Sequence, residues 1–403
     1  MNLALENTIG LLCAAILVAI VARRVRLPYT VGLVITGIAL AAARIQTGTM
    51  LTHEFVFDVI LPPLLFEAAL NLHWRELSTD FPPILALSTL GVLISAAVVT
   101  VGMTFLLDWP LGPALIFGVA IAATDPIAVI ALFKDNGIKG RLRTLVESES
   151  LFNDGTAAVL FALAYTSIRS GAMGVASITY TLTTMIGGGI AVGLLCGAVS
   201  IMLIGRTSDY LVETTVTTVA AYGSFLAAEH FGFSGVLATV VTGILMGNWG
   251  PLKKSERGVL IENGRAFLLS FWDFAAFIAN SLVFLLIGLA VATVSFKDFG
   301  IAPLSATICL VLVARGITVY PICFIFRNSR WNIPIPEQHV LWWGGLRGAL
   351  ALALTLALPP EFDHRNEIIV AAFAVVVFSV VVQGLTMPAL LKILGISNTS
   401  TDS

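Results

Sequence analysis

Apolar runs about as long as a membrane is thick follow one another almost from end to end of the chain, separated by short polar segments. A hydrocarbon core of ~30 Å is crossed by a helix of about 20 apolar residues. No segment has the composition of a soluble domain or a low-complexity linker. The pattern predicts an all-α membrane protein with about thirteen transmembrane spans, at residues 3–22, 27–45, 53–71, 82–107, 112–134, 145–168, 174–204, 209–230, 232–248, 265–293, 300–327, 338–358 and 366–396.

Composition supports the membrane class. Of the 403 residues, 58% are hydrophobic and 11% are charged, whereas soluble domains carry about 25% charged residues. The net charge of −2 says little about partners, and the absence of a basic run predicts no nucleic-acid partner. The first apolar stretch lacks a basic leader and is expected to be retained. The spacing of the four cysteines predicts no metal site: Cys13, Cys196, Cys309 and Cys323.

The basic residues predict an orientation. If the N-terminus lies outside and successive loops alternate, 16 of the 22 Lys and Arg residues fall on the cytoplasmic side and 4 fall outside. This asymmetry follows the positive-inside rule. It predicts a multi-pass protein of the inner (plasma) membrane with a cytoplasmic C-terminus.

The fifth span contains Ala-Thr-Asp-Pro at 123–126. Pro126 lacks an N–H and its ring clashes with the carbonyl of residue 122, so the helix is expected to open there. Ala122 would then present a free carbonyl beside Thr124 and Asp125, and all three groups are oxygen ligands for a hard cation. The alternative is a proline-kinked structural helix that Asp125 caps.

The sixth span begins Glu-Ser-Glu-Ser-Leu-Phe-Asn-Asp-Gly at 147–155. Side chains four apart share a helix face, which pairs Ser150 with Asp154 and Glu149 with Asn153. An acidic first helical turn would explain Glu147. It does not explain Asp154, which lies deeper and precedes a long apolar run, so Asp154 is a candidate functional residue.

The twelfth span contains Gly-Gly-Leu-Arg-Gly-Ala at 344–349. Arg347 stays charged and needs a partner, and Glu149 is the preferred one, in a structural ion pair. Glu67 follows two prolines in the third span, in an apolar setting. Arg315 in the eleventh span is expected to form another structural ion pair.

The two unusual spans, the fifth and the twelfth, are seven crossings apart and therefore run in opposite directions. Paired interrupted helices in inverted halves indicate a transporter whose binding site lies near the middle of the membrane. The repeat is inferred from the positions of these spans.

Five motifs carry a family resemblance. The chain resembles the NhaP-type sodium/proton antiporters of the cation:proton antiporter superfamily, relatives of the eukaryotic sodium/proton exchangers. The motifs occur in order along nearly the whole chain: Arg-Leu-Pro-Tyr-Thr-Val-Gly at 26–32, Ala-Thr-Asp-Pro at 123–126, Glu-Ser-Leu-Phe-Asn-Asp-Gly at 149–155, Phe-Ser-Gly-Val-Leu-Ala at 233–238 and Gly-Gly-Leu-Arg-Gly-Ala at 344–349.

The resemblance implies a homodimeric antiporter with crossed, broken helices at the fifth and twelfth spans. It implies transport-core helices at about 82–168 and 300–396, dimerisation helices at about 1–71 and 209–293, and a linker helix at about 174–204. It places sodium ligands at Asp154, Thr124, Ser150 and Glu67, with Asp125 and Asn153 beside them. It also implies the Glu149–Arg347 ion pair. An Asn-Asp pair at 153–154 is the form found in exchangers regarded as electroneutral.

The expected mechanism is competition of a proton and a sodium ion for the Asp154 carboxylate, because either one neutralises it while the bare charge is too costly to move across the membrane. The function is then sodium/proton exchange, with lithium as another possible cargo, serving pH homeostasis. No enzyme activity, catalytic residue or cofactor is predicted, and the remaining partner is membrane lipid. The alternatives are a potassium/proton antiporter, a cation channel and an intramembrane aspartyl protease that uses Asp125 and Asp154.

Overall fold

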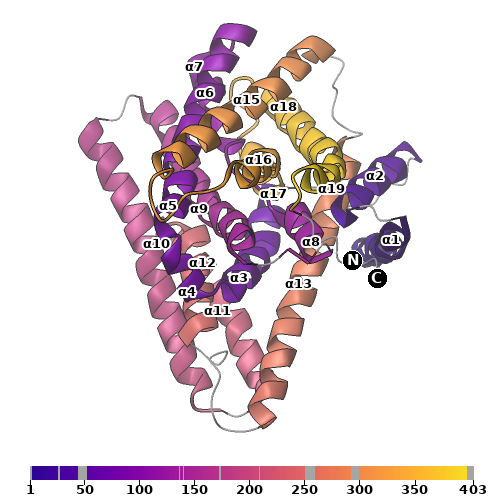
Figure 1. Ribbon diagram of the computed structural model, residues 1–403, viewed down its shortest axis with the longest axis vertical. Coiled ribbons are helices and arrows are strands. Elements are labelled where there is room, and N and C mark those ends of the chain that lie inside the picture. Colours follow the sequence, from indigo (N-terminus) through magenta and orange to yellow (C-terminus); the bar gives the residue numbers. More distant parts are fainter. Residues whose placement is uncertain are drawn as a thin grey trace. The chain divides into compact units, whose positions relative to one another are not determined.

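The computed structural model describes residues 2–25, 28–43, 52–135, 137–138, 140–171, 174–207, 209–249, 259–291 and 299–396, and every regular element in these ranges is a helix (Figure 1). Eight predicted spans each correspond to one continuous helix. These are α1 (Asn2–Val25), α2 (Tyr29–Ala42), α9 (Arg141–Ser170), α10 (Val175–Ile204), α11 (Tyr210–His230), α12 (Gly235–Trp249), α13 (Val259–Val291) and α15 (Ile301–Ile325).

The other five predicted spans are interrupted, and a short α4 (Trp74–Thr79) lies between the third and the fourth. The expected breaks in the fifth and twelfth spans are present, and breaks in the third, fourth and thirteenth spans were not predicted. The pieces are η1 (Phe55–Ile60) and α3 (Leu61–Asn71), α5 (Phe81–Ser88) and α6 (Leu90–Leu107), α7 (Leu111–Ala120) and α8 (Ile127–Asp135), α16 (Ile335–Trp343) and α17 (Ala349–Leu356), and α18 (Arg365–Phe378), η2 (Ser379–Gln383) and α19 (Gly384–Ile393).

Six described helical segments are long and apolar enough to cross a membrane: 81–107, 141–169, 175–204, 264–291, 301–325 and 365–393. Among the other spans, the fifth and the twelfth each consist of two short helices, α7 with α8 and α16 with α17. The protein is therefore a multi-pass membrane protein, while the total of thirteen crossings stays a prediction.

The break in the third span has a local cause. Pro62 and Pro63 supply no N–H to the preceding turn, and the helix there widens into the π-helical η1. The carbonyl of Val59, which the N–H of residue 63 would otherwise bond, accepts a hydrogen bond from the Tyr222 hydroxyl at 3.1 Å. A distant side chain thus replaces the missing backbone donor.

The chain divides into two compact units, and the first comprises the described parts of 1–56, 80–153 and 281–403. In it, α6 packs against α7 and α15, and α17 packs against α7 and α18. The second unit comprises the described parts of 57–79 and 154–280, where α12 packs against α3, α10 and α11. The boundary between Asn153 and Asp154 falls inside α9. The predicted core, dimerisation and linker regions concern movement and assembly and stay a prediction.

Candidate ion-binding site at two helix breaks

Thr124 lies in the non-helical segment between α7 and α8, and residues of α9 bond all of its polar groups. Its N–H donates to Asn153 Oδ1 at 3.2 Å, and Asn153 Nδ2 donates to its hydroxyl oxygen at 2.6 Å. The Ser150 hydroxyl donates to the Thr124 carbonyl. All three side chains are buried. The structure thus brings together three of the predicted site residues, and the geometry gives Asn153 the task of fixing Thr124.

Asp125 is the cap of α8. Its Oδ1 accepts a hydrogen bond from the N–H of Ile127, the first residue of α8, at 3.0 Å. Pro126 lies between the two and has no N–H that would need a partner. The alternative interpretation, in which Asp125 caps a proline-kinked structural helix, therefore agrees with its local geometry. The Asp125 N–H also donates to the Leu346 carbonyl in the second break at 2.7 Å, so the backbones of the two breaks touch.

The segment 344–348 between α16 and α17 frees further backbone groups at membrane depth, where each must find a partner inside the protein. The Gln383 side-chain Nε2 donates to the Trp343 carbonyl at 2.9 Å. The N–H of Arg347 donates to the Ser379 hydroxyl at 3.0 Å. Ser379 and Gln383 both lie in η2, so the unpredicted π-helical turn supports the second break.

Sequence reasoning missed Ser379 and Gln383. A signal was present, because the two polar residues are four positions apart in the otherwise apolar stretch 368–385 and both are buried. Polar side chains with this spacing on a membrane helix indicate a common face turned towards the protein interior.

The prediction that Glu149 pairs with Arg347 is wrong. Glu149 pairs with Arg315: Nη1 and Nη2 of the guanidinium approach Oε1 and Oε2 at 2.5 and 3.0 Å. Arg315 Nε and Nη2 also donate to the Leu341 carbonyl. Glu149 and Arg315 are both buried, so the ion pair joins α9 to α15 and the end of α16. The expectation that Arg315 forms a structural ion pair is confirmed.

Arg347 instead bonds the backbone of the first break. Its Nη1 donates to the carbonyls of Ala122 and Ala123 at 2.7 and 2.9 Å. The expectation that Ala122 keeps a free carbonyl for a cation is therefore also wrong. The opened helix left these carbonyls without N–H partners, and a charged guanidinium satisfies them better than a neutral donor would.

Asp154 and Glu67 belong to the second unit. Asp154 is half-buried on α9, one helical turn after Ser150. Glu67 is also half-buried, and its Oε1 accepts a hydrogen bond from Asn71 Nδ2 at 2.7 Å. Within the described residues, no three His, Cys, Asp or Glu side chains gather as a metal-binding group. The available cation ligands are oxygens of carboxylate, hydroxyl and carbonyl groups, which suit a hard cation.

Gly348 supplies a test of the contact between the breaks. A Cβ at this position would collide with the Asp125 side chain, so Gly348→Ala is expected to destabilise the protein by roughly 1–3 kcal/mol through overpacking. Thermal unfolding in detergent measures the loss. Gly223→Ala on α11 is the matched control, since a Cβ there meets nothing within 4 Å. Equal stability of the two variants would contradict the close contact.

Comparison with known proteins places this arrangement in a family. The sequence model of the transmembrane sodium/hydrogen exchanger family matches residues 11–393. The Na(+)/H(+) antiporter ApNhaP of Aphanothece halophytica is 40% identical over 375 residues, which are 92% of this chain and 70% of that protein. The Na(+)/H(+) antiporter NhaH of Halobacillus aidingensis is 35% identical over 403 residues, 96% of this chain and 97% of that protein.

A solved structure shows the same fold. The sodium proton antiporter MjNhaP1 of Methanocaldococcus jannaschii superimposes with a TM-score of 0.79 at 19% sequence identity, covering 98% of each chain. The predicted all-α antiporter fold and the family resemblance are thereby confirmed. With its helical architecture, its two apposed helix breaks and a family match over nearly its whole length, the chain belongs to the sodium/hydrogen exchanger family.

Proposed function

We propose that this protein is a sodium/proton antiporter in which a proton and a sodium ion compete for the carboxylate of Asp154. The observation that carries the proposal is family membership over nearly the whole chain, together with relatives above 30% identity that are named Na(+)/H(+) antiporters. Transport of this kind uses the ion gradients themselves, so the protein is a transporter rather than an enzyme and needs no cofactor.

The proposed sodium ligands are Asp154, Ser150, the Thr124 carbonyl or hydroxyl and Glu67. Support comes from α9, where Ser150 and Asp154 are four residues apart and therefore share a face. Further support comes from the hydrogen bonds that fix Thr124 to Ser150 and Asn153. A rigid Thr124 gives the site a fixed ligand, while Asp125 and Asn153 position it. Sodium is the transported substrate of this site.

The exchange cycle follows from the cost of moving charge. A bare carboxylate cannot cross the hydrophobic barrier cheaply, whereas Asp154 carrying either a proton or a sodium ion is neutral. The loaded site can therefore face either side of the membrane in turn, and the empty site cannot. One ion leaves only in exchange for the other, which couples the sodium gradient to the proton gradient.

Assembly and placement complete the proposal. The protein acts in the plasma membrane as a homodimer, with its N-terminus outside and its C-terminus in the cytoplasm, as the distribution of basic residues favours. The helices at about 82–168 and 300–396 move as the transport core relative to those at about 1–71 and 209–293, with the linker helix at about 174–204 between them.

The test of this function is exchange in proteoliposomes. The purified protein is reconstituted with an internal pH dye, and sodium, lithium, potassium or choline chloride is added outside. Sodium is expected to move protons, lithium is a second candidate cargo, and choline is the negative control. Proton movement driven by potassium but not by sodium would contradict the proposed substrate, and conductance without coupled proton movement would identify a channel.

Electroneutral exchange is a second expectation for these liposomes. Because residue 153 is an amide, this point of α9 carries one titrating carboxylate, at Asp154, and one sodium can replace one proton. A membrane potential imposed by potassium and valinomycin, without a sodium or pH gradient, is expected to drive no net transport. Asn153→Asp is expected to remain electroneutral or to fail, because Asn153 holds Thr124. Potential-driven, sodium-dependent proton uptake by the unmodified protein would refute a one-for-one exchange.

A further inference from the structure

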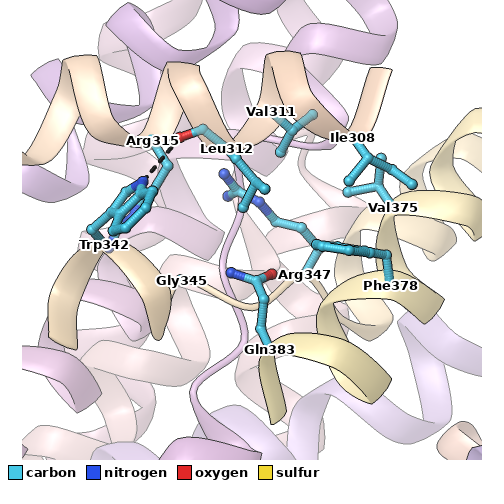
Figure 2. A pocket seen from close by; sticks show the side chains of 10 residues that line it. All are labelled: Ile308, Val311, Leu312, Arg315, Trp342, Gly345, Arg347, Val375, Phe378 and Gln383. Atoms are coloured by element: carbon cyan, nitrogen blue, oxygen red, sulfur yellow. Dashed lines mark hydrogen bonds between the residues drawn. The ribbon is translucent and has the colours of Figure 1, made fainter. Parts of the chain in front are cut away.

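Asp273 is a charged residue on an exposed face of a membrane-spanning helix. It lies in α13 nine residues after the start of the apolar segment 264–291, which is about 14 Å along the helix axis. Its side chain is exposed and forms no hydrogen bond or ion pair with any residue that the structure describes. By contrast, Arg315 and Arg347 are buried and line a small cavity (Figure 2). A bare carboxylate facing lipid at the depth of Asp273 is unfavourable.

The helix that carries Asp273 packs against α3 within the second unit. The rings of Phe66 on α3 and Trp272 on α13 have their centroids 4.5 Å apart. The same buried cluster contains Leu70, one turn later on α3, and Leu268, one turn earlier on α13. This order agrees with an antiparallel arrangement, which also follows from the positions of the two helices as the third and tenth predicted spans.

Antiparallel packing brings the next residue of each helix to the same side of the pair. Successive residues of an α-helix are rotated by 100° in a fixed sense, and reversing one of two facing helices makes both rotations point to one side. Glu67 follows Phe66, and Asp273 follows Trp272. The two carboxylates therefore lie at one level and on one side of the α3–α13 pair.

Further polar side chains occupy this side. Asn71 lies one turn after Glu67 and donates from Nδ2 to Glu67 Oε1 at 2.7 Å. Ser270 lies about one turn before Asp273 and is also exposed. The polar side chains thus extend from the predicted cytoplasmic ends of both helices towards the two carboxylates. Lipid tails offer such groups no hydrogen bonds, whereas water solvates all of them.

We propose that this side of the α3–α13 pair lines a water-filled entrance in which Asp273 attracts the transported cation towards Glu67. The inference rests on the proposed sodium/proton exchange and adds a residue to it. Glu67 and Asp154 are the proposed ligands of the ion, whereas Asp273 raises the local concentration of cations from which those ligands are filled. Attraction through water depends on charge and is screened by salt, which separates this role from a purely structural one.

The entrance is tested by thiol labelling in membrane vesicles that expose the cytoplasmic side. Asp273→Cys is expected to react with membrane-impermeant methanethiosulfonates, with the reactivity of the unmodified protein as background. Val219→Cys is the control for a lipid-facing position, because Val219 lies nine residues after the start of α11 and is 66% exposed; it is expected not to react. Relative to a free thiol in solution, a cationic reagent should modify Asp273→Cys about threefold faster than an anionic one, and adding Glu67→Gln should remove this preference.

The role of the charge is tested by the sodium KM of exchange in proteoliposomes, with choline salts setting the ionic strength. Asp273→Asn is expected to raise the KM about threefold at about 0.02 M and to leave the maximal rate unchanged, and the difference should disappear at about 0.5 M. Asp273→Glu keeps the charge and should keep the KM. Glu361→Gln neutralises an exposed carboxylate in the loop between α17 and α18 and should have no effect.

Three results would overturn the inference: an Asp273→Cys thiol as unreactive as that of Val219→Cys, a charge preference that Glu67→Gln leaves unchanged, or a sodium KM of Asp273→Asn equal to that of the unmodified protein at low ionic strength. Burial of Asp273 against a second copy of the chain would give the first of these. The labelling does not require transport. Absence of exchange in the unmodified protein would therefore contradict the proposed function, while the thiol reactivity would still decide whether the entrance exists.

Discussion

Asp154→Asn is expected to abolish sodium-driven proton movement while the protein remains folded. The amide has nearly the same shape as the carboxylate, but it neither binds a proton in the working pH range nor offers sodium a negative ligand. If Asp154 is the carboxylate for which the two ions compete, the variant has no negative charge for either ion to neutralise. Sodium movement can then no longer be coupled to proton movement. Proteoliposome exchange read by a pH dye measures the loss, and the unfolding midpoint in detergent establishes the fold.

Glu147→Gln is the matched control, because it neutralises a carboxylate on the same helix. Glu147 lies near the start of α9, where it pairs with Arg143 at 2.8 Å across one helical turn, with both side chains partly exposed. Such a pair contributes little, so exchange should persist. Substantial sodium-driven proton flux through Asp154→Asn would contradict the assignment of Asp154. A loss of flux in both Asp154→Asn and Glu147→Gln would indicate damage to α9 rather than the loss of a ligand.

Breaking the Glu149–Arg315 pair is expected to have the largest effect on stability. Removing one partner of a buried ion pair costs ~3–5 kcal/mol, because the other charge is left without its counter-ion. Glu149→Ala and Arg315→Ala should therefore each lower the unfolding midpoint strongly. The double variant should lose clearly less than the sum of the two, since it leaves neither charge stranded.

The same cycle distinguishes between the two arginines. Glu149 engages Arg315 with both carboxylate oxygens, whereas Arg347 donates to backbone carbonyls. The coupling of Glu149→Ala with Arg315→Ala should exceed its coupling with Arg347→Ala. A larger coupling with Arg347 would restore the pairing that the sequence alone suggested, and strict additivity in both cycles would mean that Glu149 has no specific partner.

Local chemistry in the sequence determined the class of the protein, most helix positions and the two central breaks. Apolar runs longer than a soluble helix needs have few stable places outside a membrane. Pro126 cannot continue a helix, and the glycines at 344, 345 and 348 favour an interruption. Spacing along one helix likewise placed Ser150 and Asp154 on a common face. These features depend on residues near one another in the chain, so no tertiary information was required.

Tertiary packing decided which distant groups meet. The sequence contained two intramembrane arginines and a candidate acceptor in Glu149, and helical spacing says nothing about which arginine reaches it. In the three-dimensional structure Glu149 forms its ion pair with Arg315. Arg347 instead donates hydrogen bonds to the carbonyls of Ala122 and Ala123. Opening a helix frees backbone acceptors whose position depends on the fold, and those acceptors compete with a carboxylate for the same guanidinium. The role of Ser379 and Gln383 escaped notice for the same reason, because the backbone groups they bond become available only where the second break packs against η2.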